Sequence, residues 1–383
     1  MKPYSLHSIL FFLLFVPLLS IAQSSDPILI QAVRLFDGES VKDNMDVFFE
    51  NGKVVRIVPH SPEHKANQVI DGRGKTLIPG LINAHVHIWF PMHLQEAARA
   101  GVLTVMDMHS SSYSIPILKA FQDSTHYASY LSAGPGATVP GGHGTQFGMP
   151  TPTIDSTKSA KSFTLDRVEG GSDYIKILRE PSRPTINFSQ IDTVIATAHE
   201  NDKLAVAHIS RKKDAIQLAS SDLDGFVHIW FDQVSTAEEI DTIAKGEQFM
   251  VPTIITNKRV LDYFKTQGRT ASSLNFEELK AEVQKLHEAG ITLVAGTDPP
   301  NFNINYGTDL LTEIELFVEC GLSPLEALRT ATGNAAKSFR LKEAGRLKEK
   351  GPANAVLIQG NPLEDIKAIR NIEKVWKNGQ LVK

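Results

Sequence analysis

Two histidines with a spacing of two residues, His85 and His87, close the apolar run that begins at Leu81. In a β-strand, side chains alternate between the two faces, so both imidazoles would point the same way. Histidine is the commonest metal ligand at neutral pH, and two converging imidazoles make half of a metal site. The pair alone is a weak signal, since many His-x-His pairs bind nothing.

Further ligand-type residues end later apolar runs, and they strengthen the metal hypothesis. They are Lys176, His208, His228 and Asp298. A single buried histidine is more often a core residue bonded to a backbone carbonyl. Five separate strand ends that all carry possible ligands are harder to explain by packing, so the set predicts a metal centre.

Lys176 lies in the run Tyr174–Leu178, where Ile175 and Ile177 would face covering helices and Lys176 the interior. A buried ammonium is costly and tends to lose its proton. A neutral amine can take up carbon dioxide as a carbamate, whose two oxygens can bridge two cations. The alternative is a lysine paired with a carboxylate such as Asp298, with no second metal.

The elements that would position these residues lie between about residues 79 and 343, where strands alternate with helices. The helical segments include Ser189–Asn201, Thr236–Ile243 and Phe276–Ala289. The strand candidates are Leu81–Ile88, Val102–Met106, Ala128–Ala133, Tyr174–Leu178, Ala205–Ile209, Gly225–Ile229, Phe249–Ile254 and Thr292–Gly296. Alternation of this kind predicts an α/β fold with parallel strands, and its size suits a (β/α)8 TIM barrel. An open, doubly wound sheet is the alternative, but ligands at so many strand ends favour a barrel, whose active sites gather at that rim.

Both ends of the chain have short strands separated by turn signals such as Asn51-Gly52 and Asn378-Gly379. We therefore expect the termini to pair into a small β-sandwich domain. The predicted organisation is a sandwich part at 23–78, the barrel at 79–343 and a second sandwich part at 344–383.

Residues 1–22 have the pattern of a signal peptide, with Lys2 ahead of a short apolar run and small residues up to Ala22. The run is too short to span a bilayer, so we expect cleavage and a periplasmic or secreted protein without a stable membrane anchor; an uncleaved anchor is the alternative. Cys320 is the only cysteine, which excludes an intramolecular disulfide. A net charge of -4 gives no reason to expect nucleic acid as a partner.

Taken together, these motifs resemble the amidohydrolase superfamily, in its metal-dependent branch of imidazolonepropionase-like and prolidase-like hydrolases. The resemblance rests on Pro79-Gly80-Leu81-Ile82 before His85-Val86-His87, on Lys176, His208 and His228, and on Ala295-Gly296-Thr297-Asp298. It extends through Gly141-Gly142-His143-Gly144 and Ala327–Ala336 to Gly360–Ile366, nearly the whole mature chain.

The resemblance implies the roles of individual residues. His85, His87 and Asp298 would bind the more buried metal, His208 and His228 the second, and carboxylated Lys176 would bridge two Zn²⁺ ions. Asp298 would take the proton of the attacking water and deliver it to the leaving nitrogen. The chain departs from many relatives in having no histidine in Asn305–Leu310 and in having Ala353-Asn354-Ala355-Val356 near its end. The first departure leaves the substrate class open.

Four further residues are candidates for substrate contact: His143, Trp89, Trp230 and Arg179. His143 lies in a glycine-rich loop of the kind that carries function at a barrel rim. Trp89 and Trp230 follow metal-ligand candidates and would form an apolar wall, or simply pack. Arg179 would pair with a substrate carboxylate, although a structural or solvated arginine is the commoner case.

We therefore predict an exported, metal-dependent hydrolase of C–N bonds acting on a small molecule: an amide, a cyclic amide or a dipeptide. The first alternative is a one-metal deaminase or imidazolonepropionase-like hydrolase in which Lys176 is uncarboxylated. The second is a non-catalytic binding protein on the same barrel. Relatives often assemble, so a homo-oligomer is also expected.

Overall fold

The computed structural model describes residues 27–270 and 272–382. The predicted signal peptide, residues 1–22, lies outside the described residues. Within the described part of the chain, no helix combines the length and the apolar character needed to cross a bilayer.

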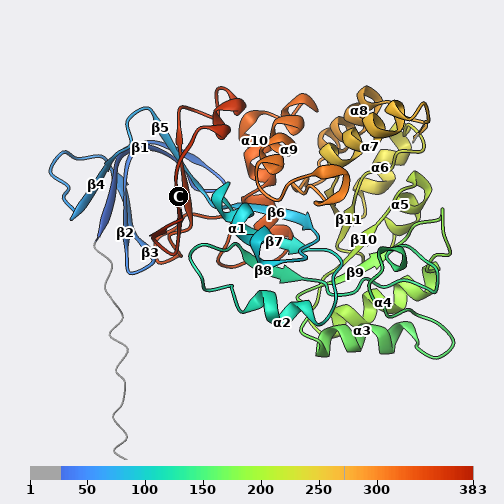
Figure 1. The fold of residues 1–383 in the computed structure, drawn as a ribbon. Coiled ribbons are helices and arrows are strands. Elements are labelled where there is room, and N and C mark those ends of the chain that lie inside the picture. The colour runs from blue at the N-terminus through green and yellow to red at the C-terminus, as the bar shows by residue number, and fades with distance from the viewer. Residues whose placement is uncertain (1–26, 271, 383) are drawn as a thin grey trace, which may run out of the picture.

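Strands from both ends of the chain form one mixed sheet of eight strands (Figure 1). Its order is β15-β14-β13-β5-β1-β2-β3, and β4 pairs with β1. The strands are β1 (Ile28–Phe36), β2 (Val41–Glu50), β3 (Lys53–Pro59), β4 (Gln68–Asp71), β5 (Lys75–Pro79), β13 (Ala355–Gln359), β14 (Ile372–Lys377) and β15 (Gln380–Leu381). The two ends of the chain meet where β5 pairs antiparallel with β13.

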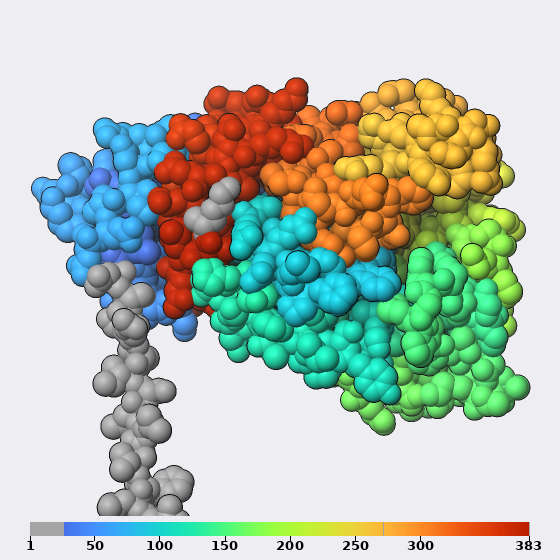
Figure 2. Space-filling view, viewed as in Figure 1, coloured from blue at the N-terminus to red at the C-terminus, as the bar shows by residue number. Residues whose placement is uncertain are grey.

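One face of this sheet buries its own apolar cluster, which includes Leu35, Phe49 and Trp376. The rings of Phe49 and Trp376 pack edge to face with centroids 5.8 Å apart. In Figure 2 the N-terminal strands and the C-terminal residues lie together at one end of the molecule. The structure thus supports a small β region built from both termini, while its arrangement as a sandwich and the three domain boundaries stay predictions.

The middle of the chain has two parallel sheets flanked by helices. One has the order β6-β7-β8 and the other β12-β11-β10-β9. The strands are β6 (Leu81–Val86), β7 (Val102–Asp107), β8 (Ser129–Ser132), β9 (Ile175–Leu178), β10 (Ala205–His208), β11 (Gly225–Val227) and β12 (Phe249–Val251). The predicted parallel α/β organisation is confirmed.

The eighth predicted strand, Thr292–Gly296, is not a regular strand in the structure. Its backbone bonds to β12 on one side and to β6 on the other, through Met250 N–H to Thr292 O, Val294 N–H to Met250 O and Ala84 N–H to Ala295 O. The Ala295 N–H, however, donates to Thr330 O at the end of α10 (Pro324–Thr330). Because these bonds are shared among three neighbours, the segment forms an isolated bridge instead of a continuous ladder.

The parallel strands bury both of their faces, as their near-continuous apolar runs require. Alternate residues of different strands, such as Ala84, Tyr174 and Val206, pack together in an inner cluster. The intervening residues, such as Ile175 and Ile177, pack in the larger cluster with residues of the helices. The expected division of Tyr174–Leu178 between two faces is therefore confirmed.

The remaining helices mostly follow the strands and end near the predicted positions. They are α1 (Pro91–Arg99), α2 (Ser114–Lys119), α3 (Ala160–Glu169), α4 (Phe188–Glu200), α5 (Lys212–Leu218), α6 (Ala237–Ala244), α7 (Ile254–Thr266), α8 (Phe276–Glu288), α9 (Thr308–Glu319) and α11 (Gly333–Ser338). The helices α4, α6 and α8 begin with capping boxes at Asn187, Thr236 and Asn275. Each box satisfies backbone donors that a helix start leaves unpaired, which explains why these starts are readable in the sequence. Short 3₁₀ turns lie at Thr145–Phe147, Asn301–Asn303 and Ile366–Arg370.

Candidate metal centre

One cavity of about 240 Å³ lies at the carboxyl ends of the parallel strands. All six predicted metal ligands line it: His85, His87, Lys176, His208, His228 and Asp298. His85, Lys176 and His208 lie in β6, β9 and β10. His87 follows β6, His228 follows β11, and Asp298 follows the irregular segment 292–296. The structure therefore brings together residues that lie more than 200 positions apart in the chain.

The first half of the cluster is built around Asp298. Its Oδ1 lies 3.3 Å from His85 Nε2 and 3.0 Å from His87 Nε2. Asn301 Nδ2 donates to the same oxygen at 2.9 Å. His87 Nδ1 donates to the carbonyl of His109 at 3.1 Å, which orients the ring and directs Nε2 at the carboxylate.

The second half consists of His208 and His228, whose ring centroids are 4.6 Å apart. His228 Nδ1 is hydrogen-bonded to Thr253 Oγ1 at 2.7 Å, so its Nε2 is left for a ligand. The rings of His85 and His228 are 4.7 Å apart at their centroids. One ligand atom each from His85, His228 and Asp298 lies within 4.8 Å of the other two, a group able to hold a metal ion.

Lys176 extends from β9 into the cavity with only 2% of its surface exposed. Its Nζ has no hydrogen-bond partner among the described residues. Burial lowers the pKa of this amine to about 7, although the nearby Asp298 carboxylate acts in the opposite direction. A large fraction of the amine is thus neutral at physiological pH, the form that reacts with carbon dioxide.

Burial also keeps most of the imidazoles neutral. It lowers the pKa of His85 and His228 far below the ordinary value and that of His208 as well. His87 differs. Burial lowers its pKa, but the hydrogen bond to Asp298, the negative charges of Asp298 and Asp107 and the hydrogen bond to the His109 carbonyl together raise it by more. Neutral imidazoles are the form that binds metal. His85 Nδ1 is buried and has no hydrogen-bond partner within residues 27–270 and 272–382.

The backbone is strained at three positions of this cluster. His228, Thr253 and Asp298 have φ values of 67°, 50° and 56°, in the left-handed region that favours glycine. Such conformations cost about 1–3 kcal/mol each and persist where the surroundings enforce them. Their concentration around one cavity is typical of a functional site.

Neighbouring elements enforce these conformations. A Cβ at Gly296 would lie 2.9 Å from His85 Cβ, so only glycine lets this segment approach β6 and bring Asp298 beside the histidines. Glu313 of α9 accepts hydrogen bonds from the N–H groups of Ile254 and Ile255 at 2.8 and 2.7 Å. These bonds fix the start of α7 and with it Thr253, the partner of His228; burial raises the pKa of Glu313 to about 8.

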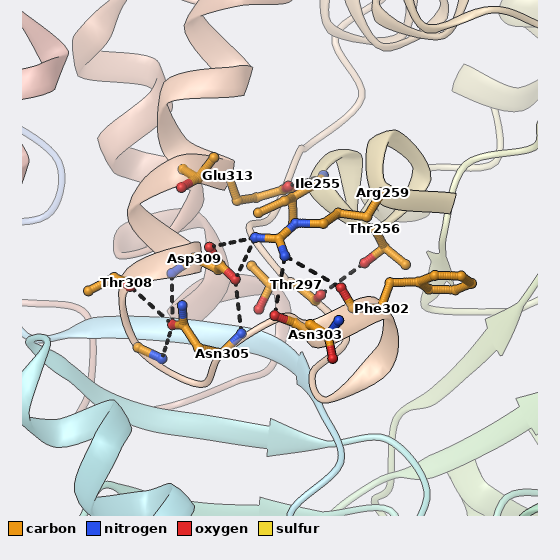
Figure 3. A network of polar contacts seen from close by, with 12 residues as sticks. Ile255, Thr256, Arg259, Thr297, Phe302, Asn303, Asn305, Thr308, Asp309 and Glu313 are labelled. Carbon is orange, nitrogen blue, oxygen red and sulfur yellow. Dashed lines mark hydrogen bonds and ion pairs between the residues drawn. The ribbon is translucent and has the colours of Figure 1, made fainter. Parts of the chain in front are cut away.

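A second network holds the loop that follows Asp298 (Figure 3). Arg259 of α7 donates to the carbonyls of Phe302 and Asn303 at 3.4 and 3.2 Å. The same guanidinium forms two hydrogen bonds, of 3.2 and 3.1 Å, with the Asp309 carboxylate. Asp309 also accepts from the N–H of Asn305 at 2.9 Å. The loop that carries Asn301 and Phe302 over the cavity is thereby tied to α7 and α9.

The predicted substrate residues are placed differently from one another. His143 lines the cavity, with its ring 4.6 Å from that of His208. Trp230 is fully buried, and its indole N–H donates to Glu282 at 3.0 Å, so it packs in the core and does not line the cavity. Arg179 donates to Ile186 O and Asp214, which gives it a structural role outside the cavity. Trp89 is 44% exposed and is not a lining residue. Trp89, Trp230 and Arg179 are not among the residues that line the cavity, and their contact with a substrate stays a prediction.

Sequence reasoning missed Glu180, which lines the cavity with Oε2 3.4 Å from His208 Nε2. Burial raises the pKa of Glu180, but hydrogen bonds from His208 and Ser182 outweigh burial and hold it below its ordinary value. The period of two that placed Lys176 and Leu178 on the inner face extends to Glu180 and would have found it. Asn301 and Thr253 carry no comparable spacing signal, since each acts from a loop whose path the sequence does not reveal.

Residues 76–382 match the model of the amidohydrolase family. The chain belongs to the amidohydrolase family. Ochratoxinase from Aspergillus niger is 23% identical over 335 residues, covering 75% of this chain and 67% of that protein. Dihydroorotase from Endomicrobium trichonymphae is 23% identical over 390 residues, covering 86% and 89%.

Solved structures of similar fold include amidohydrolase relatives with low sequence identity. A Xaa-Pro dipeptidase superposes with a TM-score of 0.78 at 20% identity and covers 93% of this chain and 99% of its own. A prolidase-type protein from Bifidobacterium longum gives 0.78 at 23% identity, covering 93% and 94%. Family membership makes this amidohydrolase a hydrolytic enzyme that acts on C–N bonds, and it speaks against the alternative of a non-catalytic binding protein.

Proposed function

We propose that this amidohydrolase is a metal-dependent enzyme that cleaves the C–N bond of a small amide, cyclic amide or dipeptide, with two Zn²⁺ ions bridged by carboxylated Lys176. The observation that carries the proposal is the Lys176 amine, which has no hydrogen-bond partner among the described residues and is buried in one cavity with Asp298 and the four histidines predicted to bind metal. A buried amine without a hydrogen-bond partner is costly unless it is modified or bound.

The residues present fit a pair of divalent cations. His85, His87 and Asp298 would hold one ion, His208 and His228 the other, and a carbamate on Lys176 would offer one oxygen to each. Imidazole and carboxylate together suit zinc. When bound, the ions would polarise the scissile carbonyl and lower the pKa of the attacking water.

Asp298 is positioned to move the proton. Asn301 Nδ2 donates to Asp298 Oδ1 at 2.9 Å, which leaves Oδ2 to accept a proton and return it to the leaving nitrogen. The Asn301 amide keeps the carboxylate from rotating. Phe231, Phe302 and Leu178 contribute apolar lining that would exclude bulk water around the reacting groups.

The fold supports the same proposal, since active sites of TIM barrels lie at the carboxyl ends of the strands. We propose that the two parallel sheets are parts of one (β/α)8 barrel. The segment of Ala137 links to β9 through Ala137 N–H to Lys176 O, and the segment 292–298 links β12 to β6. The Xaa-Pro dipeptidase among the similar structures supports a dipeptide as one candidate substrate.

A one-metal enzyme is the second candidate, because His85, His228 and Asp298 alone form a group able to hold a single ion. In that case Lys176 would stay an unmodified amine paired with Asp298. Adenine deaminases are among the similar proteins, such as one from Listeria innocua at 25% identity over 381 residues, covering 91% of this chain and 56% of that protein.

Metal analysis of the purified protein, together with turnover, separates these candidates. We expect about two zinc ions per chain and hydrolysis in a screen of dipeptides, N-acyl amino acids and cyclic amides, with activity lost after chelation and restored by zinc. One ion per chain at full activity would favour the one-metal enzyme. Undiminished hydrolysis after exhaustive chelation would overturn both.

We also propose that the protein is exported after cleavage behind Ala22 and that it assembles into a homo-oligomer. The amino-terminal sequence pattern supports export, and the resemblance to amidohydrolases supports assembly. Amino-terminal sequencing of the protein recovered from cell fractions and light scattering of the mature chain test these two points. A full-length cytoplasmic protein, or a monomer at high concentration, would contradict them.

A further inference from the structure

Glu180 belongs to a loop that is fixed in place just after β9. Its N–H donates to Thr185 Oγ1 at 3.0 Å, and its Oε1 accepts from the N–H of Ser182 at 2.9 Å. Arg179 ties the far end of the loop through a 2.6 Å hydrogen bond to Ile186 O. These hydrogen bonds fix the loop, and the loop holds the Glu180 carboxylate in the cavity. The Glu180 side chain is only 14% exposed.

The charge of this carboxylate is only partly compensated. A carboxylate accepts about four hydrogen bonds, and among the described residues Glu180 accepts from the Ser182 N–H, from the Ser182 hydroxyl and, at 3.4 Å, from His208. Among residues 27–270 and 272–382, no lysine or arginine lies within ion-pair distance of it. A largely buried carboxylate with no lysine or arginine beside it can pair with a cationic group that enters the cavity with a ligand.

The surroundings of Glu180 define what else such a ligand must carry. Apolar side chains line the same cavity, among them Leu178, Phe147 and Phe231. The loop of His143 packs directly against the loop of Glu180, since a Cβ at Gly142 would lie 2.9 Å from Pro184 O. The ligand would therefore combine an apolar body with a positive charge.

We propose that Glu180 is a specificity-determining residue that recognises a cationic amino group of the substrate, close to the bond that is cleaved. The proposal deepens the proposed hydrolase function and rests on it for the identity of that bond. The ammonium would donate to the acceptor position of Glu180 that the described residues leave open. Charge-assisted hydrogen bonds of this kind are about twice as strong as neutral ones.

A structural role for Glu180 is the competing explanation, because its carboxylate also orients His208. Glu180→Gln separates the two roles. The amide oxygen of glutamine can still accept the hydrogen bond from His208, but the side chain carries no charge. Glu169→Gln, at the exposed end of α3, makes the same chemical change away from the cavity and serves as the control.

The test measures binding of two probes to the zinc-loaded enzyme by calorimetry at about pH 6.5, where an alkyl amine is protonated. The probes are 2-phenylethylammonium and its neutral counterpart 2-phenylethanol, neither of which can be hydrolysed. We expect the wild type and Glu169→Gln to bind the ammonium at least about tenfold more tightly than the alcohol. Glu180→Gln should lose this preference while its affinity for the alcohol stays within about twofold.

Equal affinity for the two probes in the wild type, or binding of neither, would overturn the proposal. It would also fall if Glu180→Gln weakened both probes alike, which would assign the residue to the positioning of His208. None of these outcomes depends on turnover. Failure of the hydrolase proposal itself would appear separately, in the metal content and the substrate screen.

Discussion

In two places within the described residues an aspartate lies between two histidines, and one of these clusters has the features of a reaction centre. In the β region, Asp46 lies between His60 and His64, with Nδ1 of each ring 3.0 and 2.6 Å from the carboxylate. In the cavity, Asp298 lies between His85 and His87 at similar distances. The residue types are the same in the two places, and the distances are similar.

The difference lies in how completely each cluster is satisfied by the protein. Asp46 is fully buried and also accepts from the N–H groups of Ala32 and Ser61 at 2.8 and 3.1 Å, which fills about four acceptor positions. In the cavity, by contrast, the buried atoms His85 Nδ1 and Lys176 Nζ have no hydrogen-bond partner in the part of the chain that the structure describes. A cluster that completes its own hydrogen bonds stabilises the fold, whereas one that leaves them open is arranged for a ligand.

Asp298→Asn should give the largest loss of activity, because asparagine cannot accept the proton of the attacking water. General acid–base catalysis contributes about 10²–10⁴-fold, and loss of a metal ligand adds to it, so we expect kcat to fall by at least about a thousandfold. Steady-state kinetics measure this fall, and circular dichroism checks the fold. The exposed Asp222→Asn is the matched control and should keep full activity. Turnover of Asp298→Asn near the wild-type rate would refute the role of Asp298.

Lys176→Met should have the next largest effect, since methionine fills a similar volume but cannot form a carbamate. We expect the metal content to fall from two ions to at most one and the activity to fall at least about a hundredfold, because even outer-shell changes cost about 10–100-fold. Elemental analysis measures the metal. Intact mass should show one added CO2 in the wild type and none in the variant.

The control for this change is Lys245→Met, which removes an exposed amine after α6 and should retain both ions. Two firmly bound ions in Lys176→Met would show that the second site does not need the lysine. The difference between the cavity cluster and the Asp46 cluster would then depend on the histidines alone.

Arg259→Ala should have a moderate effect, because it frees the loop that carries Asn301 without touching the reacting groups. Misplacement by about 1 Å can cost up to 10²-fold in rate, so we expect about a tenfold fall in kcat/KM with the metal content unchanged. Arg269→Ala removes an exposed guanidinium just after α7 and should have no effect. A wild-type kcat/KM in Arg259→Ala would show that the loop is held by its other contacts.

A feature of the fold or of the site could be predicted from the sequence where it depends on neighbouring residues, and could not where it depends on residues distant in the chain. The alternation of side chains along a strand predicted that Lys176 faces the interior. The positions of His85, His208 and His228 at strand ends predicted that they lie close together. Both rules depend only on local sequence. The buried position of Trp230 could not be predicted, because its partner Glu282 lies 52 residues away on a helix whose packing the sequence does not reveal. The irregular segment at 292–296 has the same cause, since its backbone partners lie on three distant elements.

Asp46→Asn should leave kcat/KM within about twofold but lower the free energy of unfolding, which is the reverse of Asp298→Asn. The buried carboxylate would lose charge-assisted hydrogen bonds, a cost of about 1–3 kcal/mol. Burial raises the pKa of Asp46, but hydrogen bonds from His64, Ala32, Ser61 and His60 outweigh burial and hold it below the ordinary value. A lowered pKa in the folded state means that the stabilisation is complete above the unfolded value of about 3.9 and is lost as the pH falls through the folded value. Denaturant unfolding should therefore give the wild type a higher free energy of unfolding than Asp46→Asn at pH 6, and this difference should shrink below about pH 4. A difference that does not depend on pH would contradict the stabilising role of the Asp46 carboxylate. A large loss of turnover in Asp46→Asn would show that the two clusters do not divide stability and catalysis between them.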